Sequence, residues 1–168
     1  MRTYNSLEAF KSFVDRSITE VTAEMLEGVT SIGQYAFNGC SSLASITIPE
    51  GVTLIENGAF ANCSSLASIT IPEGATRIGE NAFNYCDSLT SAMIPESMAN
   101  IQYMCFNGCN RLASITVRAT IPPILAYGVF QGTSQSLIIY VPAASVDTYK
   151  AATNWSTYAS KIQAIPSH

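Results

Sequence analysis

Four phenylalanines recur at one fixed interval along the chain: Phe37, Phe60, Phe83 and Phe106. Four cysteines and four leucines keep the same interval: Cys40, Cys63, Cys86 and Cys109, with Leu43, Leu66, Leu89 and Leu112. Only stacked and equivalent units need the same residue at the same step, so this period outweighs any local propensity. The chain is therefore predicted to be a repeat solenoid, in which each unit packs against its neighbours in sequence.

Each repeat is predicted to contribute one short strand. In the first unit it spans residues 43–48, where β-branched residues partly alternate before Pro49 ends the run. Alternate side chains of this strand are expected to face opposite ways: Leu43, Ile46 and Ile48 inward, Ser45 and Thr47 outward. Strands of successive units should stack in parallel about 4.8 Å apart, so that each repeat position forms a ladder of like residues.

The remainder of each unit returns the chain to the next strand. Proline and glycine in the segment 49–51 predict a turn, after which Val52 and Ile55 are expected to enter the core. The apolar spacing within the segment 36–40 suits one tight helical or 3₁₀ turn on the side of the coil opposite the strand.

A single domain is predicted for the whole 168-residue chain. Residues 29–142 hold about five repeats, of which the fifth is degenerate, because Phe130 stands one position later than the period requires after Phe106. Residues 1–28 are predicted to form a helical N-terminal cap and residues 143–168 a C-terminal cap. The ends must differ from the repeats because each terminal unit has one face without a neighbour.

Both caps are predicted to contain a short helix. At the front, Asn5 can cap a helix in which Glu8 completes a capping box. At the back, residues 143–152 are expected to be helical, with Val146 and Tyr149 facing inward. Four further apolar residues are expected to fold over the last coil: Trp155, Tyr158, Ile162 and Ile165.

Composition excludes several classes of partner. The net charge is −4, with 8 Lys and Arg and no basic cluster, which argues against nucleic acid and anionic membrane surfaces. No apolar run approaches the ~20 residues that a membrane helix requires. The opening residues, Met1 to Thr3, do not begin a signal peptide, so the protein is predicted to be intracellular as written or a mature or subcloned piece of a secreted one.

The sequence offers little for catalysis. Its one histidine, His168, is the last residue, so no Ser/His/Asp or Cys/His arrangement with a rigidly held base is available. No glycine-rich phosphate loop is present either. We therefore predict that the protein is not an enzyme and that it uses no cofactor or metal.

Two periodic columns could still carry chemistry. The cysteine column, together with Cys105, could bind a soft metal, but it is better explained as a buried row of five reduced thiols. An acidic column also keeps the period and could hold Ca²⁺ or supply an acid and a base: Glu27, Glu50, Glu73 and Glu96. Because each of these carboxylates is next to a turn and no calcium-loop signature accompanies them, exposed turn residues are the favoured interpretation.

The repeat unit I-G-x-x-A-F-x-x-C-x-x-L-x-x-I-x-I-P resembles the BspA-type leucine-rich repeat. Residues 32–49, 55–72 and 78–95 carry this unit nearly intact. Departures occur where Ala92 replaces Ile, Cys105 replaces Ala and Arg118 replaces Pro. The resemblance implies a right-handed leucine-rich-repeat coil from a bacterium or its phage. It also implies a surface or secreted protein of the adhesion type, in a family without a shared active site.

Two sets of residues are predicted to contact a ligand. The first is the outward strand face, which is small, uncharged and rich in hydroxyls: Ser45, Thr47, Ser68, Thr70, Ser91, Met93, Ser114 and Thr116. The second consists of residues that interrupt their columns without a reason in the core: Tyr35, Arg77, Tyr85, Tyr103 and Arg111. A solvated repeat face and tolerated surface variation are the alternatives for these two sets.

The favoured function is a non-enzymatic module that binds a protein or a glycan through the solenoid surface, in a bacterial surface or secreted protein or a phage-associated one. A passive structural spacer within a larger surface protein is the second hypothesis. An enzyme that uses the acidic column is the remote third.

Overall fold

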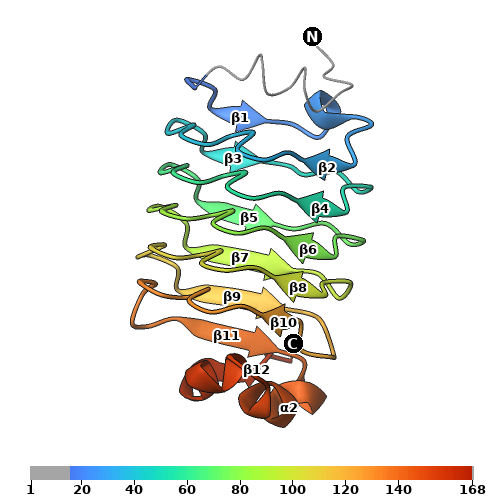
Figure 1. Ribbon diagram of the computed structural model, residues 1–168, viewed down its shortest axis with the longest axis vertical. Helices are drawn as coiled ribbons and strands as arrows, with labels where there is room; N and C mark the ends of the chain where they lie inside the picture. Colours follow the sequence, from blue (N-terminus) through green and yellow to red (C-terminus); the bar gives the residue numbers. More distant parts are fainter. Residues whose placement is uncertain (1–15, 168) are drawn as a thin grey trace.

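Each repeat forms one turn of a coil, and the coils stack in sequence order along the long axis of the molecule (Figure 1). The structure is a computed structural model that describes residues 16–167. One end of the stack is formed by the first described residues, and the other end is covered by a layer of short helices. The predicted solenoid with stacked parallel strands is confirmed.

The first column of strands is the predicted one. Its members are β3 (Ser45–Ile46), β5 (Ser68–Thr70), β7 (Ser91–Ile94), β9 (Ser114–Val117) and β11 (Ile138–Val141). Strands β5, β7, β9 and β11 form one parallel sheet in sequence order, and β12 (Ile162–Ala164) adds a final strand after β11. At the other end β3 pairs in parallel with β1 (Glu20–Val21).

A second column of strands was not predicted. It consists of β2 (Ser31–Ile32), β4 (Leu54–Ile55), β6 (Arg77–Ile78), β8 (Asn100–Ile101) and β10 (Ile124–Leu125), which form a five-stranded parallel sheet. The prediction of one strand per repeat was therefore incomplete. A two-residue strand is too short to show an alternating pattern, although the predicted burial of Val52 and Ile55 is confirmed.

The third side of each coil is a series of turns in place of the predicted helical or 3₁₀ turn. The N–H of Ala36 donates to the carbonyl of Gly33 at 3.1 Å, within the same coil. The next N–H, that of Phe37, donates to the carbonyl of Ala59 in the following coil at 2.7 Å. Local and inter-coil bonds alternate along this segment, so no continuous helix forms.

Stacked phenylalanines run through the centre of the coils. Phe37, Phe60, Phe83 and Phe106 are fully buried, and neighbouring ring centroids lie 5.1 to 5.2 Å apart. Phe130 continues the stack at 6.0 Å from Phe106, although it comes one residue late in the sequence. The fifth coil thus absorbs its extra residue without breaking the core.

Three short helices form the C-terminal cap: η2 (Ala143–Ser145), α2 (Val146–Ala151) and η3 (Trp155–Lys161). Four of its side chains donate hydrogen bonds to carbonyls of the last coil: Ser145 to Thr120, Tyr149 to Ala119, Asn154 to Leu125 and Trp155 to Pro123, at 2.6 to 2.8 Å. One coil earlier, the carbonyls equivalent to those of Pro123 and Leu125 accept such bonds from backbone N–H groups of the next coil. The predicted cap is confirmed, and the side chains of Asn154 and Trp155 supply hydrogen bonds that a sixth coil would otherwise donate.

The coil begins earlier than the predicted boundary at residue 29. Strand β1 lies within the segment assigned to the N-terminal cap, yet it pairs with β3 in the register of a preceding coil. A short 3₁₀ helix, η1 (Glu24–Leu26), follows it, and Leu26 is buried. The helix predicted from Asn5 lies outside the described residues.

Candidate functional site

The structure brings the predicted hydroxyl residues together on the outer face of the first strand column. Register pairs align them in two rows, one through Ser68, Ser91 and Ser114 and the other through Thr70, Met93 and Thr116. Ser45 and Thr47 lie one coil earlier. The N–H of Ala67 donates to the carbonyl of Ala44 at 3.3 Å and so joins this coil to the next. This surface is continuous, and we call it the hydroxyl face.

The hydroxyl face changes character along the stack. The residues of β3 and β5 that belong to it are exposed, whereas those of β7 and β9 are half-buried. In the next coil the two rows continue into Ile138 and Tyr140. The face offers hydrogen-bond donors and acceptors over small side chains, but little aromatic area except at its C-terminal end.

The predicted tyrosines lie on the turn side of the coil. Tyr35 and Tyr85 both have φ of 56°, a left-handed conformation that is costly for an aromatic residue. Each ring covers a glycine of the next coil, Gly58 under Tyr35 and Gly108 under Tyr85, where a Cβ atom would overlap the ring. One face of each ring is thus used in packing, while about half of each side chain remains exposed.

Tyr103 has a neighbour that the sequence analysis missed. Its ring stacks on that of Tyr127, with centroids 6.2 Å apart and planes tilted by 23°. Tyr127 is 67% exposed, which makes it the most exposed tyrosine of the described residues. Like Phe130, it comes one position later than the period requires, so the signal was the change of period in the fifth repeat.

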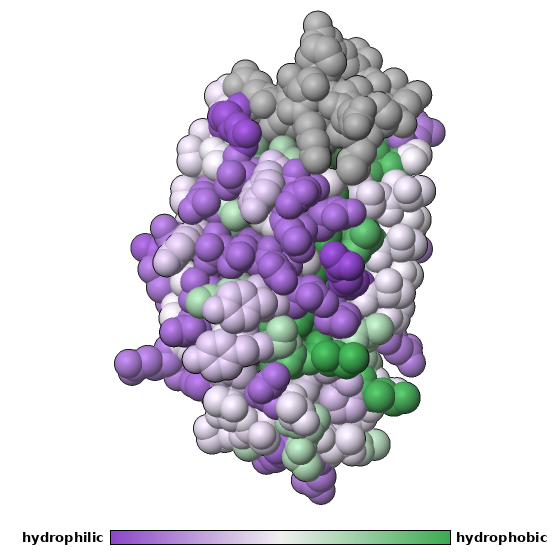
Figure 2. Space-filling view, in the orientation of Figure 1, coloured by the Kyte–Doolittle hydropathy of each residue, from purple (hydrophilic) through white to green (hydrophobic). Residues whose placement is uncertain are grey.

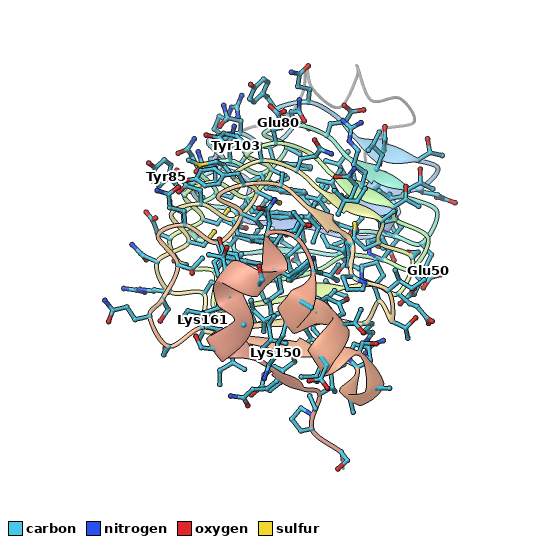
Figure 3. The ribbon with its side chains drawn as sticks, turned by 60° about the horizontal axis from the view of Figure 1, so that its bottom comes forward. Glu50, Glu80, Tyr85, Tyr103, Lys150 and Lys161 are labelled. Atoms are coloured by element: carbon cyan, nitrogen blue, oxygen red, sulfur yellow. The ribbon has the colours of Figure 1, made fainter. Side chains whose placement is uncertain are left out.

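The candidate residues do not form one site. Tyr85, Tyr103 and Glu80 lie on one side of the coil, and Glu50 lies on the other (Figure 3). Arg77 belongs to β6 in the second sheet, between Leu54 and Asn100 of its neighbouring strands. Arg111 belongs to the loop before β9. The predicted positions are therefore distributed over separate surfaces of the solenoid.

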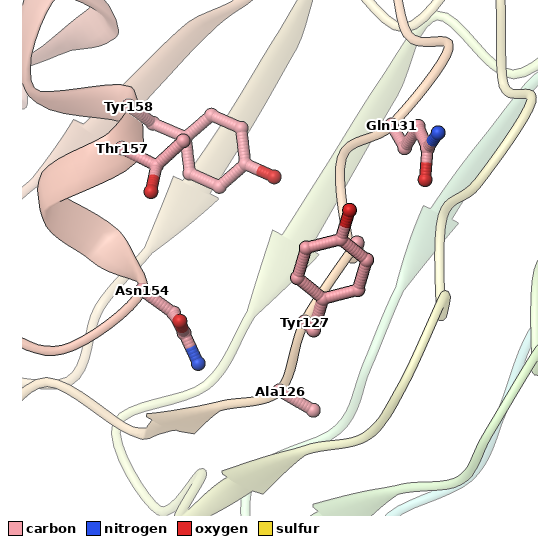
Figure 4. A pocket seen from close by; sticks show the side chains of 7 residues that line it. Ala126, Tyr127, Gln131, Asn154, Thr157 and Tyr158 are labelled. Atoms are coloured by element: carbon pink, nitrogen blue, oxygen red, sulfur yellow. The ribbon is translucent and has the colours of Figure 1, made fainter.

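A groove that sequence reasoning missed lies between the fifth coil and the C-terminal cap. Its volume is about 290 Å³. Tyr127 and Gln131 of the fifth coil line one side, and Asn154, Thr157 and Tyr158 of the cap line the other (Figure 4). Strand β11 and α2 separate the two sides in the sequence, so no local motif could have indicated this juxtaposition.

A second hollow, of about 450 Å³, lies on another side of the same end of the stack. Its lining is mostly apolar and includes Met98, Ile121, Pro122 and Ile124, together with Glu96 and Thr120. The side chains of Ile121 and Ile124 are strongly exposed. Figure 2 shows hydrophobic side chains gathered over the later coils on the side of the second sheet.

The cysteine column is a packing feature. All five cysteines are buried, and the thiol of Cys63 donates to the carbonyl of Phe37 at 3.2 Å. Cys86 and Cys109 repeat this contact with the phenylalanine carbonyl of the preceding coil. Burial, together with the neighbouring Cys40, raises the pKa of Cys63 to about 12. Burial also raises the pKa of Cys105 well above its usual value, so these thiols are held in the protonated, unreactive form.

The acidic column occupies exposed turns. The carboxylates of Glu27, Glu50, Glu73 and Glu96 follow the first strands of their coils and face solvent. Among residues 16–167 no group of three or more His, Cys, Asp or Glu side chains is placed to hold a metal ion. The exposed-turn interpretation fits this placement.

Comparison with known proteins identifies the family. The sequence profile of the BspA type leucine rich repeat region matches residues 8–136 in six copies. The chain belongs to the BspA-type leucine-rich repeat family. The match covers most of the coil described above, including the segment around β1 that lies before the predicted first repeat.

A solved structure agrees with this assignment. A leucine-rich repeat protein of T. pallidum (TpLRR) is 25% identical over 89% of this chain and 81% of its own, with a TM-score of 0.60. Leucine-rich repeat proteins of Bacteroides ovatus and Faecalibacterium prausnitzii, the latter described as a cell surface protein, are 30% and 26% identical over 75% and 77% of this chain, with TM-scores of 0.44 and 0.46. This chain spans 40% and 46% of their lengths.

No curated protein matches the sequence significantly. Within the described part of the chain, no helix has the length and apolar character needed to cross a bilayer.

Proposed function

We propose that this domain is a non-enzymatic binding module that takes a protein or glycan ligand on the outer surface of its coils. The observation that carries the proposal is the set of exposed tyrosines on the turn side of the coil. Tyr103 and Tyr127 form a stacked pair at the surface, and the core needs neither ring. Exposed aromatic side chains held by packing are typical anchors of binding surfaces.

The hydroxyl face is the second candidate surface for the ligand. Its two aligned rows present regularly spaced hydroxyl groups, and the face of a solenoid sheet is a common binding surface. We assign the domain to a bacterial surface or secreted protein, or a phage-associated one, in an adhesive role. Membership of the BspA-type leucine-rich repeat family supports this assignment.

Direct binding tests the proposal. The purified domain is passed over immobilised host matrix proteins, mucins and bacterial surface glycans, and binding is measured by surface plasmon resonance. Phe83→Ala, assayed above its own melting temperature and below that of the native domain, serves as the unfolded control, because it removes a central ring of the buried stack. The proposal predicts saturable binding to at least one ligand that disappears in this control.

A passive spacer predicts the opposite result. The cap covers the C-terminal end of the core, where β12 adds a last strand beside β11. A domain that only separates its neighbours would bind nothing in the panel while remaining folded. Absence of binding across the panel would therefore overturn the binding proposal in favour of the spacer.

A further inference from the structure

The groove between the fifth coil and the C-terminal cap is built from residues that the repeat does not require. One wall comes from the turn segment of the fifth coil and the other from η3, which has no counterpart in the repeats. The volume of about 290 Å³ is at the small end for ligand sites. A groove of this size suits one small ring or a short chain of rings.

The wall that belongs to the coil carries an aromatic platform. The period lengthens by one position here, which places Tyr127 against Tyr103. Gly128 follows with φ of 74° and turns the chain beneath the platform. Tyr103 supports one side of the Tyr127 ring, while 67% of the Tyr127 side chain stays open to solvent. The platform is therefore fixed and accessible.

The opposite wall supplies uncharged polar groups. The amide nitrogen of Asn154 donates to the carbonyl of Leu125 at 2.7 Å, which fixes the side chain and leaves its oxygen outside that bond. Thr157 and Tyr158 add hydroxyl groups on the same side, and the amide of Gln131 lies across from them (Figure 4). Amides and hydroxyls both donate and accept hydrogen bonds, and none of the described residues that line the groove is charged.

We propose that this groove binds a neutral pyranose unit of a glycan, with the Tyr127 ring stacked on the apolar face of the sugar. The inference rests on the proposed binding function and names its ligand class. Sugar hydroxyls donate and accept, as the amides and hydroxyls of the walls do, and a neutral ring matches the uncharged lining. The exposed ring face provides the apolar contact.

An extended peptide fits the groove less well. Peptides often add to the free edge of a sheet, and β10 is the last strand of the second sheet. The side chains of Asn154 and Trp155 donate to the carbonyls of Leu125 and Pro123, so the cap closes that edge beside the groove. A ligand held there must depend on side-chain contacts.

The test begins with an array of neutral oligosaccharides of hexoses, N-acetylhexosamines and deoxyhexoses, with sulfated and sialylated versions and a peptide library beside them. The best neutral glycan is then titrated by calorimetry into the native domain and into three variants: Tyr127→Ala, Thr157→Ala and Ile121→Ala. Ile121 is the matched control, because it is a large and strongly exposed side chain at the same end of the stack but outside the groove. Thermal melting confirms that each variant is folded.

The inference predicts that Tyr127→Ala weakens the affinity at least about tenfold, that Thr157→Ala weakens it about threefold, and that Ile121→Ala changes it less than about twofold. Preference for charged glycans or peptides, or equal affinity of Tyr127→Ala and native protein, would overturn it. Loss of glycan binding only in hydroxyl-face variants would also overturn it while leaving the proposed binding function intact. Failure to bind any ligand on the array or the protein panel would instead remove the proposed function itself.

Discussion

The four coils that carry Phe37 to Phe106 and the end of the stack that carries Phe130 solve the same packing problem in different ways. In the regular coils, the same contacts recur from one coil to the next. Phenylalanine rings stack on one another, and cysteine thiols donate to phenylalanine carbonyls of the preceding coil. At the end, Phe130 meets the tilted ring of Trp155 and the edge of Tyr158. The repeated residues build the regular coils, whereas the end of the stack is closed by side chains that occur once, and one of them, Tyr158, also lines the groove.

The largest expected effect tests the scaffold. Phe83→Ala should lower the free energy of unfolding by ~3–5 kcal/mol, because it opens a cavity between two stacked rings. Urea unfolding followed by circular dichroism measures this loss. A loss below about 1 kcal/mol would mean that the aromatic stack does not hold the coils together.

The hydrogen bond of one buried hydroxyl group is expected to stabilise the cap. Tyr149→Phe removes the buried hydroxyl that donates to the carbonyl of Ala119 at 2.6 Å, so the free energy of unfolding should fall by ~1–3 kcal/mol. Tyr127→Phe is the control, because its hydroxyl belongs to an exposed ring. If both variants have the native melting temperature, the cap does not depend on this side-chain hydrogen bond to the last coil.

The thiol column predicts a loss of stability in alkali. The pKa of Cys63 is raised from 9.0 to about 12, chiefly by burial. In that interval the unfolded chain releases the proton while the folded chain keeps it, so stability is complete below pH 9 and falls as the pH rises toward 12. The fall contributed by this thiol can reach ~1.4 kcal/mol per pH unit.

Urea midpoints from about pH 8 to about pH 11 measure this dependence. Cys63→Ala should flatten the slope by the contribution of one proton. An unchanged slope in this variant would show that Cys63 does not titrate differently in the folded and unfolded chains.

Alanine substitutions at two glycines can distinguish the cost of backbone strain from the cost of a clash with a tyrosine ring. Gly58→Ala should destabilise the protein by ~1 kcal/mol more than Gly74→Ala. Both positions have positive φ, but only at Gly58 would the new Cβ meet the ring of Tyr35. Thermal melting of the single variants, and of Tyr35→Ala with Gly58→Ala, measures the coupling. Independent effects of the two substitutions would show that the ring does not rest on the glycine.

The smallest expected effect belongs to the hydroxyl face. Replacing Ser68 and Thr70 by alanine should change the free energy of unfolding by less than ~0.5 kcal/mol each, because both side chains are exposed. The same melting assay compares this double variant with Phe83→Ala. Similar losses in the two proteins would contradict the inward and outward assignment of the strand.

Much of the solenoid core could be predicted because each contact position recurs in several repeats of the sequence. The period located the phenylalanine stack, and the alternation in residues 43–48 predicted which side chains face solvent. The second sheet escaped notice because its two-residue strands show no period. The alternating bonds of the turn side escaped because they depend on the next coil, as between Phe37 and Ala59.

The groove could not be predicted for a related reason. Tyr127 departs from the period of the fifth repeat and Tyr158 belongs to the cap, so no second copy indicated their environment. The extra residue before Phe130 was visible in the sequence, but its consequence, the stacking of Tyr127 on Tyr103, depends on how the fifth coil accommodates that residue. A solenoid sequence thus predicts its interior better than its ends.

The most direct test compares how substitutions on two surfaces change the affinity for one ligand. The ligand that binds best in the panel is titrated into the native domain, a Tyr103→Ala and Tyr127→Ala double variant, and a Ser68→Ala and Thr70→Ala double variant. The account predicts that affinity falls sharply in the tyrosine variant and stays near the native value in the hydroxyl-face variant. The reverse pattern would contradict it, since binding would then depend on the regular coils and not on the irregular end.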